Sequence, residues 1–542
     1  MKNRSFDLET FSKPYYSFID EFAKTGSETA KLLGKFYTDF SVGEILVEEI
    51  VKSIKAEQFT ENIKIIDPFC GDGRLIVELL KNIYQIKQCE KLIFEITLWD
   101  VDEYAVDIAK SAVADIAKDL KLNIKIQTKV TDAFVSYSEV MNMFDICITN
   151  PPWGLLKPLK VFNNRCNSEE LNKYKETILM YSKYMDEEFT ISRPMSRYGK
   201  WGTNLGRCGV ELALKLITNN GICGIVSPVT LFTDKVSIGL RKWIFDNYDI
   251  HSVFYFPAEL NLYKGADVSS VTAVVKKGLT EEITIRTYDS NFNFRESILA
   301  NDDITRIKSN DYVIPLDLDD TSKSIWEKWE KFITVEEYCE IKGLHFIREL
   351  DETRIKEKLC DSSKYAFAKG YMVNKYVFTP DNLFLDESMI KIPKSAKHLK
   401  LVWRDVSRSS QKRRVKAAIL PKYCIAGNSL GVLYSEDDNI NVIKSMLAIM
   451  NSYVFEFQVR KQLISNHVPA GVIKKMKIPS IIDTFELITL VDKKLAGELV
   501  EDQIEVMVAK MYGLKLEEFT TIVNSFDKDN CDYGYWEHIW NE

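Results

Sequence analysis

The residues with the clearest chemical potential lie in the stretch Asp145–Trp153, written DICITNPPW. Phe144–Ile148 is predicted to form a short buried strand. The sequence Asn150-Pro151-Pro152 ends it, because neither proline can donate a ladder hydrogen bond. Each proline also favours extended geometry in the residue before it. We therefore expect the Asn150 side chain to be held at the carboxyl end of a strand, where open α/β sheets bind their ligands.

A rigid amide in this position suits the methylation of a planar exocyclic amine. The lone pair of such a nitrogen is delocalised into its ring, so the nitrogen is a poor nucleophile. The Asn150 side-chain oxygen and the Pro151 carbonyl could accept its hydrogens and free the lone pair, as preorganised groups do where charge develops. The Trp153 ring could hold the base by stacking. The alternative is that Asn-Pro-Pro-Trp forms only a turn.

A second candidate site lies in the segment Ile63–Leu75, IKIIDPFCGDGRL. It is predicted to run from a buried strand through a turn into a helix. Gly71 and Gly73 permit a tight turn and close approach of a ligand to the backbone. The spacing Gly-x-Gly-x-x-Gly of dinucleotide sites is absent. The turn therefore fits a smaller ligand, S-adenosylmethionine (SAM), whose cationic amino-acid end Asp67 could meet.

The segment Phe94–Asp102 predicts a strand that ends in carboxylates. An acidic residue at the end of a second strand commonly accepts hydrogen bonds from ribose hydroxyls. We favour Asp100 over Asp102 for this role, because Asp100 is the first residue beyond the strand. Val101 could pack on the adenine of the cofactor. Capping of the next helix is the alternative role of either aspartate.

A third predicted strand, Asn123–Lys129, leads to Asp132. Asp132 could accept a hydrogen bond from the cofactor's adenine amino group, with Phe134 against the adenine ring. Ala133 lies between them and is assigned to the same site. The polar candidates thus follow successive strands, which predicts an α/β domain with a doubly wound, mostly parallel sheet.

Composition sets the limits of this interpretation. The chain has 542 residues, a net charge of −7 and 46% hydrophobic residues, which suits a globular protein of two or three domains. The ten cysteines are scattered without a Cys-x-x-Cys pair, so structural zinc is not expected, and their usage suits a reducing cytosol. The sequence has no signal-peptide core and no run of 18 apolar residues, so we expect a cytoplasmic protein.

Five elements in this order resemble the gamma-class amino-methyltransferases that act on adenine N6 in DNA: GKFYT at 34–38, DPFCGDG at 67–73, Asp100, Asp132 and NPPW at 150–153. The resemblance spans roughly residues 33–277. It implies a SAM-dependent, Rossmann-like methyltransferase domain over residues 1–300. It also implies a mixed α+β target-recognition domain over residues 301–542. Protein-glutamine and some RNA methyltransferases have a similar Asn-Pro-Pro-aromatic sequence.

The resemblance assigns a role to each matching position. Tyr37 and Thr38 would help to hold the cofactor, although capping a helix is the local alternative for Thr38. The remaining assignments are Asp67, Gly71 and Gly73 for the methionine part, Asp100 for the ribose, Asp132 for the adenine, and Asn150, Pro151, Pro152 and Trp153 for the target base. Cys70, Asp72 and Arg74 stand where such proteins usually have small residues, and Trp153 replaces the commoner Tyr or Phe. None of these departures removes a needed group, so activity is expected.

Two further features lie between residues 151 and 280. Leu155–Gly209 is a long polar segment with interleaved aromatic residues, and we predict that part of it becomes ordered against DNA. A solvated insertion is the alternative. In the resembled family, an aromatic residue near Leu262–Ala266 stacks on the target adenine, and we assign this role to Tyr263, with Phe256 as the second candidate.

The second domain contains a basic segment, Lys391–Lys422, in an otherwise acidic protein. Such a stripe is typical of nucleic-acid binding, and a solvated charged face is the alternative. The predicted DNA contacts are Arg404, Arg408, Lys412, Arg413 and Arg414. The loops Gly427–Gly431 and Gln462–Gly471 could carry base contacts. The end, Phe485–Val523, is predicted to be helical and to serve packing.

Together these features predict methylation of adenine N6 in double-stranded DNA, with the adenine flipped out of the stack and the DNA in a basic cleft. No metal is needed. The resemblance implies a restriction-modification or related defence or epigenetic system. About 30 residues precede the first motif, so we expect no fused nuclease, although a separately encoded endonuclease could be a partner. The alternatives are methylation of an RNA base, of cytosine N4 or of a protein glutamine, and a DNA-binding module without activity.

Overall fold

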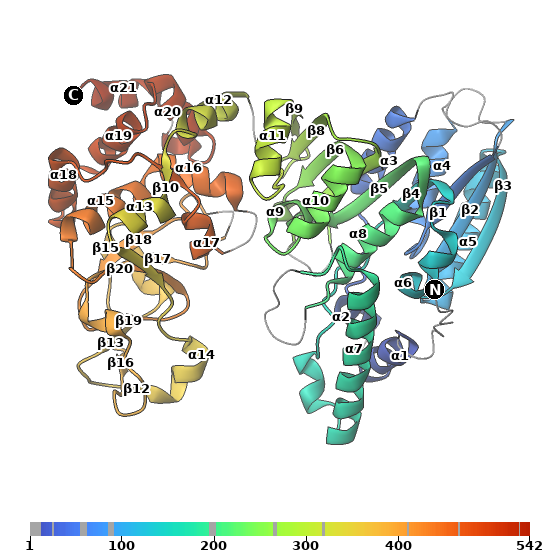
Figure 1. The fold of residues 1–542 in the computed structure, drawn as a ribbon, viewed down its shortest axis with the longest axis horizontal. Helices are drawn as coiled ribbons and strands as arrows, with labels where there is room; N and C mark the ends of the chain where they lie inside the picture. Colours follow the sequence, from blue (N-terminus) through green and yellow to red (C-terminus); the bar gives the residue numbers. More distant parts are fainter. Residues whose placement is uncertain are drawn as a thin grey trace. The chain divides into compact units, whose positions relative to one another are not determined.

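The structure is a computed structural model that describes residues 12–23, 26–54, 62–84, 91–194, 202–263, 268–316, 320–408, 411–463, 467–530 and 532–542. The chain divides into two compact units, Met1–Leu316 and Asp317–Glu542, and each is described by itself (Figure 1). Within the described ranges, no helix combines the length and the apolar character that a membrane span requires.

A nine-stranded sheet with the order β3-β2-β1-β4-β5-β7-β6-β8-β9 forms the centre of the first unit. Its strands are β1 (Asn62–Asp67), β2 (Ile93–Asp100), β3 (Asn123–Val130), β4 (Phe144–Thr149), β5 (Ile217–Pro228), β6 (Tyr248–Phe256), β7 (Ser270–Lys277), β8 (Glu282–Tyr288) and β9 (Phe294–Ala300). The strands β1 to β5 pair in parallel. In contrast, β7 is antiparallel to both of its neighbours, and β9 is antiparallel to β8.

Strand order reverses between β1 and β4, because β2 pairs on one side of β1 and β4 on the other. The register sets Ile66 beside Cys147, so the strand ends carrying Asp67 and Asn150 are neighbours. In open α/β sheets, ligands bind outside the carboxyl ends of strands at such a reversal.

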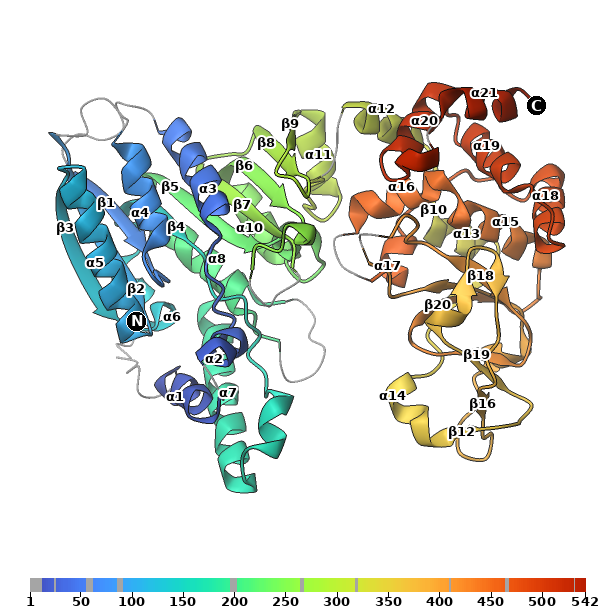
Figure 2. The same cartoon turned by 180° about the vertical axis from the view of Figure 1, so that it is seen from behind.

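Helices cover both faces of this sheet. α3 (Phe40–Ser53), α4 (Arg74–Ile83) and α5 (Glu103–Asp119) lie over one face, whereas α8 (Leu205–Leu216) and α10 (Ile238–Asn247) lie over the other (Figure 2). The predicted doubly wound α/β fold is therefore confirmed. Further helices of this unit are α1 (Ser12–Phe22), α2 (Gly26–Leu33), α6 (Ala133–Ser136), α9 (Thr230–Thr233) and α11 (Asp302–Ser309), and α11 extends this unit past residue 300.

The polar segment Leu155–Gly209 contains a 21-residue helix, α7 (Ser168–Glu188), which was not predicted from the sequence. A capping box between Asn167 and Glu170 starts this helix. Five of its seven buried residues carry a hydroxyl group (Tyr174, Thr177, Tyr181, Ser182 and Tyr184), so the hydrophobic pattern of the helix is weak. Tyr174 stacks on Tyr15 of α1, with ring centroids 6.4 Å apart. Arg197, Tyr198, Lys200 and Trp201 of this segment lie outside the described residues.

The second unit combines helices with short strands, as expected for a mixed α+β unit. Two four-stranded sheets consist of β11 (Leu344–Ile347), β20 (Leu430–Ser435), β17 (Lys400–Arg404) and β18 (Ala417–Leu420), and of β12 (Leu359–Cys360), β16 (Phe384–Leu385), β13 (Ala366–Ala368) and β19 (Cys424–Ala426). Its longer helices are α12 (Asp320–Trp329), α13 (Val335–Ile341), α15 (Ile440–Asn451), α16 (Tyr453–Gln462), α18 (Phe485–Leu495), α19 (Glu501–Met511), α20 (Leu516–Asn524) and α21 (Tyr533–Asn541).

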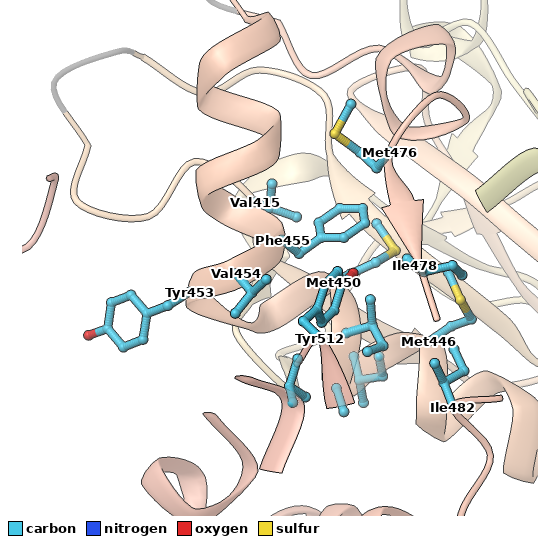
Figure 3. Packing of buried hydrophobic residues seen from close by; sticks show 14 of the residues in the cluster. Val415, Met446, Met450, Tyr453, Val454, Phe455, Met476, Ile478, Ile482 and Tyr512 are labelled. Carbon is cyan, nitrogen blue, oxygen red and sulfur yellow. The ribbon is translucent and has the colours of Figure 1, made fainter. Parts of the chain in front are cut away.

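The core of the second unit forms around α15 and α16. Figure 3 shows Met446 and Met450 of α15 together with Val454 and Phe455 of α16. Later segments close this core with Met476, Ile478, Ile482 and Tyr512. The helices α18 to α20 bury Leu487, Val491, Ile504 and Phe519, which confirms the predicted packing role of the segment Phe485–Val523.

Candidate active site

Asn150 follows the last residue of β4 and is held through its amide nitrogen. Nδ2 donates hydrogen bonds to the Phe36 carbonyl at 2.8 Å and to the Thr38 hydroxyl at 3.1 Å. These two bonds fix the plane of the side chain. The amide oxygen, Oδ1, is buried and has no hydrogen-bond partner. A fixed, buried acceptor without a partner is suited to receive a donor from a ligand.

The residues Asn150 to Trp153 form a corner after β4. Hydrogen bonds join both ends of this corner to the segment Gly34–Thr38. Gly34 accepts a hydrogen bond from the Trp153 amide at 3.0 Å. Its φ of 70° is left-handed, and a Cβ added there would lie 2.7 Å from the Gly154 nitrogen. Only glycine permits both the conformation and the approach. The Arg74 guanidinium also donates to the Thr38 carbonyl at 2.6 Å.

A cavity of about 820 Å³, including the solvent open to it, lies beside this corner. Most of the predicted cofactor residues line it, and so do Asn150 and Pro152. The predicted cofactor residues on its wall are Tyr37, Thr38, Asp67, Gly71, Asp100, Val101, Asp132 and Ala133. The structure therefore brings together residues that the sequence separates by more than 110 positions.

Asp67 is a buried carboxyl on the wall of this cavity. Its Oδ1 accepts hydrogen bonds from the Thr149 hydroxyl at 2.7 Å and the Phe69 amide at 3.1 Å. Although both bonds favour the ionised form, burial raises the pKa of Asp67 from 3.8 to about 7. An incoming cation would lower this pKa again, so the site favours a positively charged group.

Asp100 and Asp102 have different roles. Asp100 lines the cavity, and its Oδ2 accepts the Gly71 amide at 3.0 Å. Asp102 is the N-cap of α5 and accepts the amides of Tyr104 and Ala105. Burial raises the pKa of Asp100, and the Lys35 ammonium, 3.9 Å from its Oδ1, opposes that shift. The geometry places Asp100, and not Asp102, against the cavity.

Two predicted cofactor residues do not line the cavity. Phe134 is fully buried and packs on Phe69, which lines the cavity, with ring centroids 5.1 Å apart; the contact of its ring with adenine stays a prediction. Gly73 is the left-handed N-cap of α4, and a Cβ there would lie 2.9 Å from the Ala109 backbone. Gly73 therefore permits helix packing and does not form part of the cavity wall.

The carboxylate of Asp132 is engaged within the protein. Its Oδ1 accepts the Phe134 amide at 2.9 Å, and its Oδ2 accepts the Tyr181 hydroxyl. Tyr181 belongs to α7, and Tyr16 of α1, which hydrogen bonds to Tyr181, lines the cavity. The sequence did not identify Tyr16 or Lys35 as site residues. Local pattern carries no signal for Tyr16, because its position depends on how α1 packs.

The two aromatic residues predicted to sandwich the target base contact each other. The Trp153 and Tyr263 rings lie edge to face with centroids 4.5 Å apart. Ring atoms in contact are about 3.5 Å apart, so a base between two rings would separate them by roughly 7 Å. Tyr263 is buried here, and its burial raises its pKa. The second candidate, Phe256, stacks on Tyr288 in the core.

The predicted DNA contacts of the second unit differ in exposure. Arg414 is 2% exposed, and its guanidinium donates to the Ser407 and Leu463 carbonyls. Arg413 is also internal and pairs with Glu505 at 3.1 Å. These two assignments to DNA are wrong, because internal partners hold both groups. Arg404 donates to the Val373 carbonyl at 2.6 Å.

Two basic side chains of that set remain at the surface. Arg408 is exposed. Lys412 is 60% exposed and pairs with Asp527 and Asp529. The DNA contact of these two residues stays a prediction.

Comparisons with known proteins agree on one family. A family model described as N-6 DNA methylase matches residues 7–357. The type II methyltransferase M.VspI of Vibrio sp. (strain 343) is 24% identical over 148 residues, which is 27% of this chain and 32% of that protein. The match thus spans about a third of that relative.

Among solved structures, the chain is similar to the type IIL restriction-modification enzyme MmeI in complex with DNA (TM-score 0.52, 10% identity). The match covers 97% of this chain and 82% of the MmeI chain. It is also similar to a cryo-EM structure of a DrdV–DNA complex (TM-score 0.51, 12% identity). This match covers 91% of this chain and 60% of the DrdV chain. At these identities, the likeness concerns the fold.

Proposed function

The chain belongs to the N-6 DNA methylase family, and we propose that it transfers a methyl group from SAM to N6 of an adenine flipped out of double-stranded DNA. The observation that carries this proposal is the buried, unpartnered Oδ1 of Asn150 at the wall of the cavity. An acceptor so placed can receive an N–H of the target amine.

The residues of the cavity fit SAM by their chemistry. Asp67, a carboxyl with a raised pKa, suits the ammonium group of the methionine part. The Oδ1 atom of Asp100 lies near the Lys35 ammonium and accepts a hydrogen bond from the Asp102 amide. Hydrogen bonds from the ribose hydroxyls can replace these two contacts. When bound, SAM supplies an electrophilic methyl group on a sulfonium.

The catalytic role falls to Asn150 and Pro151. The Asn150 amide oxygen and the Pro151 carbonyl accept the two N–H groups of the amine, which restores nucleophilic character to its lone pair. Since the Phe36 carbonyl and the Thr38 hydroxyl already hold the Asn150 amide, no reorganisation is needed in the transition state. Trp153 and Tyr263 hold the base by stacking, and Tyr263 leaves its contact with Trp153 to admit it.

The broader context is a restriction-modification or related system. M.VspI is described as a type II methyltransferase, and MmeI as a restriction-modification enzyme. We propose that double-stranded DNA is the substrate, that the second unit recognises it, and that a separately encoded endonuclease is a possible cognate partner.

The test is transfer of labelled methyl from SAM to bacterial DNA and to RNA, followed by nucleoside analysis. N6-methyladenine in DNA alone is the expected product. N4-methylcytosine in DNA would show that the target base is cytosine and not adenine. Label confined to RNA would show that the substrate is RNA and not DNA. SAM binding without transfer to either would overturn the proposal in favour of a binding module.

A further inference from the structure

Tyr16 of α1 lines the cofactor cavity, and its hydroxyl is the last member of a hydrogen-bonded series. The series starts at Asp132, which is 1% exposed and whose Oδ2 accepts the Tyr181 hydroxyl. The other oxygen of this carboxylate accepts the Phe134 amide at 2.9 Å. Tyr181 in turn hydrogen bonds to Tyr16, which is half-buried. The protein thus engages both oxygens of Asp132, and the series brings a hydroxyl to the cavity wall.

The carboxylate fixes the direction of these hydrogen bonds. An ionised carboxylate only accepts, so the Tyr181 hydroxyl donates its one proton to Asp132. The Tyr181 oxygen then accepts the proton of the Tyr16 hydroxyl. Because Tyr16 uses its proton in this way, its oxygen has only lone pairs left for a ligand. Tyr16 is therefore an acceptor, and each bond of such a series polarises the next in a low-dielectric site.

The packing of α1 against α7 holds Tyr16 in place. The two helices lie side by side in both views (Figures 1 and 2). Phe18 stacks on Tyr174 with ring centroids 4.2 Å apart, and the rings of Tyr15 and Tyr181 are 5.9 Å apart. A group that is already fixed loses little conformational freedom when a ligand binds.

The order of the strands places Tyr16 far from Asn150 within the cavity. Asn150, Asp67, Asp100 and Asp132 follow β4, β1, β2 and β3, which are successive neighbours in the sheet. Three strand spacings of about 4.8 Å therefore separate Asn150 from Asp132. In the proposed function, the methyl group faces Asn150 and the ribose lies at Asp100. The adenine lies beyond the ribose, at the end of the cavity that Asp132 and Tyr16 line.

The base of the cofactor offers a donor at this end. Adenine has an amino group at position 6, whereas hypoxanthine has a carbonyl, an acceptor, in the same place. We propose that the Tyr16 oxygen accepts a hydrogen bond from the amino group of the cofactor's adenine and thereby selects an adenosyl over an inosyl cofactor. This inference rests on the proposed function and deepens it. Asp132 acts through Tyr181 and Tyr16, in place of the direct contact predicted from the sequence.

The test compares the binding of S-adenosyl-L-homocysteine and S-inosyl-L-homocysteine, which differ in the base, to the 542-residue chain. Tyr16→Phe removes the acceptor and keeps the ring. Tyr15→Phe is the matched control, because Tyr15 is the neighbouring residue of α1 and does not line the cavity. Calorimetric titration gives Kd for both ligands, and a thermal melt shows whether each variant is folded.

The wild type is expected to prefer the adenosyl ligand, and Tyr16→Phe should reduce this preference about fivefold, as for one lost hydrogen bond. The reduction should come from weaker binding of the adenosyl ligand. Tyr15→Phe should keep the wild-type preference, even where both affinities fall together. Tyr181→Phe should also reduce the preference, because the Tyr16 hydroxyl can then turn and donate to the inosyl carbonyl.

An unchanged preference in Tyr16→Phe would overturn this inference. An equal reduction in Tyr15→Phe would also overturn it, since α1 would then act through packing alone. A wild type that binds both ligands equally well would overturn it without affecting the proposed function. A wild type that binds neither ligand would overturn the proposed function, and this inference with it.

Discussion

At the scale of single residues, Asn150 combines a fixed orientation with an unused acceptor. Both N–H groups of its amide are engaged, by the Phe36 carbonyl and the Thr38 hydroxyl, and the oxygen cannot exchange places with the nitrogen without losing the bond to the Phe36 carbonyl. A residue of this kind has one group for the transition state, the amide oxygen, and another for the fold, the amide nitrogen. Its removal should therefore affect turnover strongly and stability to a smaller extent.

Asn150→Ala should reduce methyl transfer by at least about a hundredfold, the scale of losing one preorganised hydrogen-bonding group. SAM should still bind, and the melting temperature should fall by a few degrees, because the hydrogen bonds to the Phe36 carbonyl and the Thr38 hydroxyl are lost. Single-turnover transfer measures the first quantity, and titration of SAM measures the second. The exposed Asn247, whose Nδ2 donates to the Trp243 carbonyl, provides the control Asn247→Ala. Near-normal turnover in Asn150→Ala would refute the catalytic role.

Asp67 should make cofactor binding depend on pH. Its pKa of about 7 in the free protein lies above the ordinary 3.8, so protonation competes with pairing to an ammonium group. SAM affinity should rise as the pH rises through 7. Stability without SAM should have the opposite dependence, because the folded state binds this proton more tightly than the unfolded state. This contribution is lost as the pH rises from about 4 to about 7.

The comparison with Asp67→Asn isolates these effects from other titrating groups. The variant should bind SAM more weakly at pH 8 and show a flatter dependence of both affinity and melting temperature on pH. Calorimetric titrations and thermal melts between pH 5 and 8 provide the measurements. A wild type and a variant with parallel pH profiles would show that Asp67 does not titrate in this range.

At the scale of elements, the segment from Gly34 to Thr38 holds the corner. It accepts the Trp153 amide at Gly34 and the Asn150 amide at Phe36 and Thr38. This segment and the strand β4 are far apart in sequence, so the catalytic geometry depends on their long-range contact. A change that separates them should affect stability and turnover together.

Gly34→Ala tests this dependence. The added Cβ would meet the backbone of Gly154 at 2.7 Å, in addition to the cost of about 1–2 kcal/mol for a left-handed alanine. Gly343 is the matched control, because its φ of 66° is similar and a Cβ there meets nothing within 4 Å. Denaturant unfolding should show a larger loss of stability for Gly34→Ala than for Gly343→Ala. Equal losses, with full transfer activity, would show that the close approach is unimportant.

At the scale of the whole molecule, the site and the predicted recognition surface belong to different units. Every residue that lines the cavity lies between Tyr16 and Pro152, within the first unit. The second unit has a large core of its own around α15 and α16. Cofactor binding and DNA recognition should therefore be separable.

A chain of residues 1–316 should bind SAM with an affinity near that of the full-length protein but should lose DNA binding at moderate salt. Titration of SAM and of a DNA duplex against both chains provides the measurement. Circular dichroism and a cooperative melt establish that the shortened chain is folded. A folded chain 1–316 that binds DNA as tightly as the full-length protein would contradict a recognition role for the second unit.

Local signals in the sequence determined the α/β fold and the strand-end positions of Asp67, Asp100 and Asn150. Proline, glycine and polar residues end strands by their own backbone preferences, and parallel strands bring their carboxyl ends to one edge. These signals require no knowledge of distant contacts.

Only the tertiary structure decided which side chains face the cavity. Gly73 was assigned to it but permits helix packing, whereas Tyr16 reaches it from α1, a segment without a local signal. Lys35 belongs to the GKFYT segment, in which only Tyr37 and Thr38 had been assigned a role. The same holds for Arg413 and Arg414, whose guanidinium groups have partners inside the protein. The physical reason is that the partner of a side chain depends on segments far away in sequence, which no local pattern specifies.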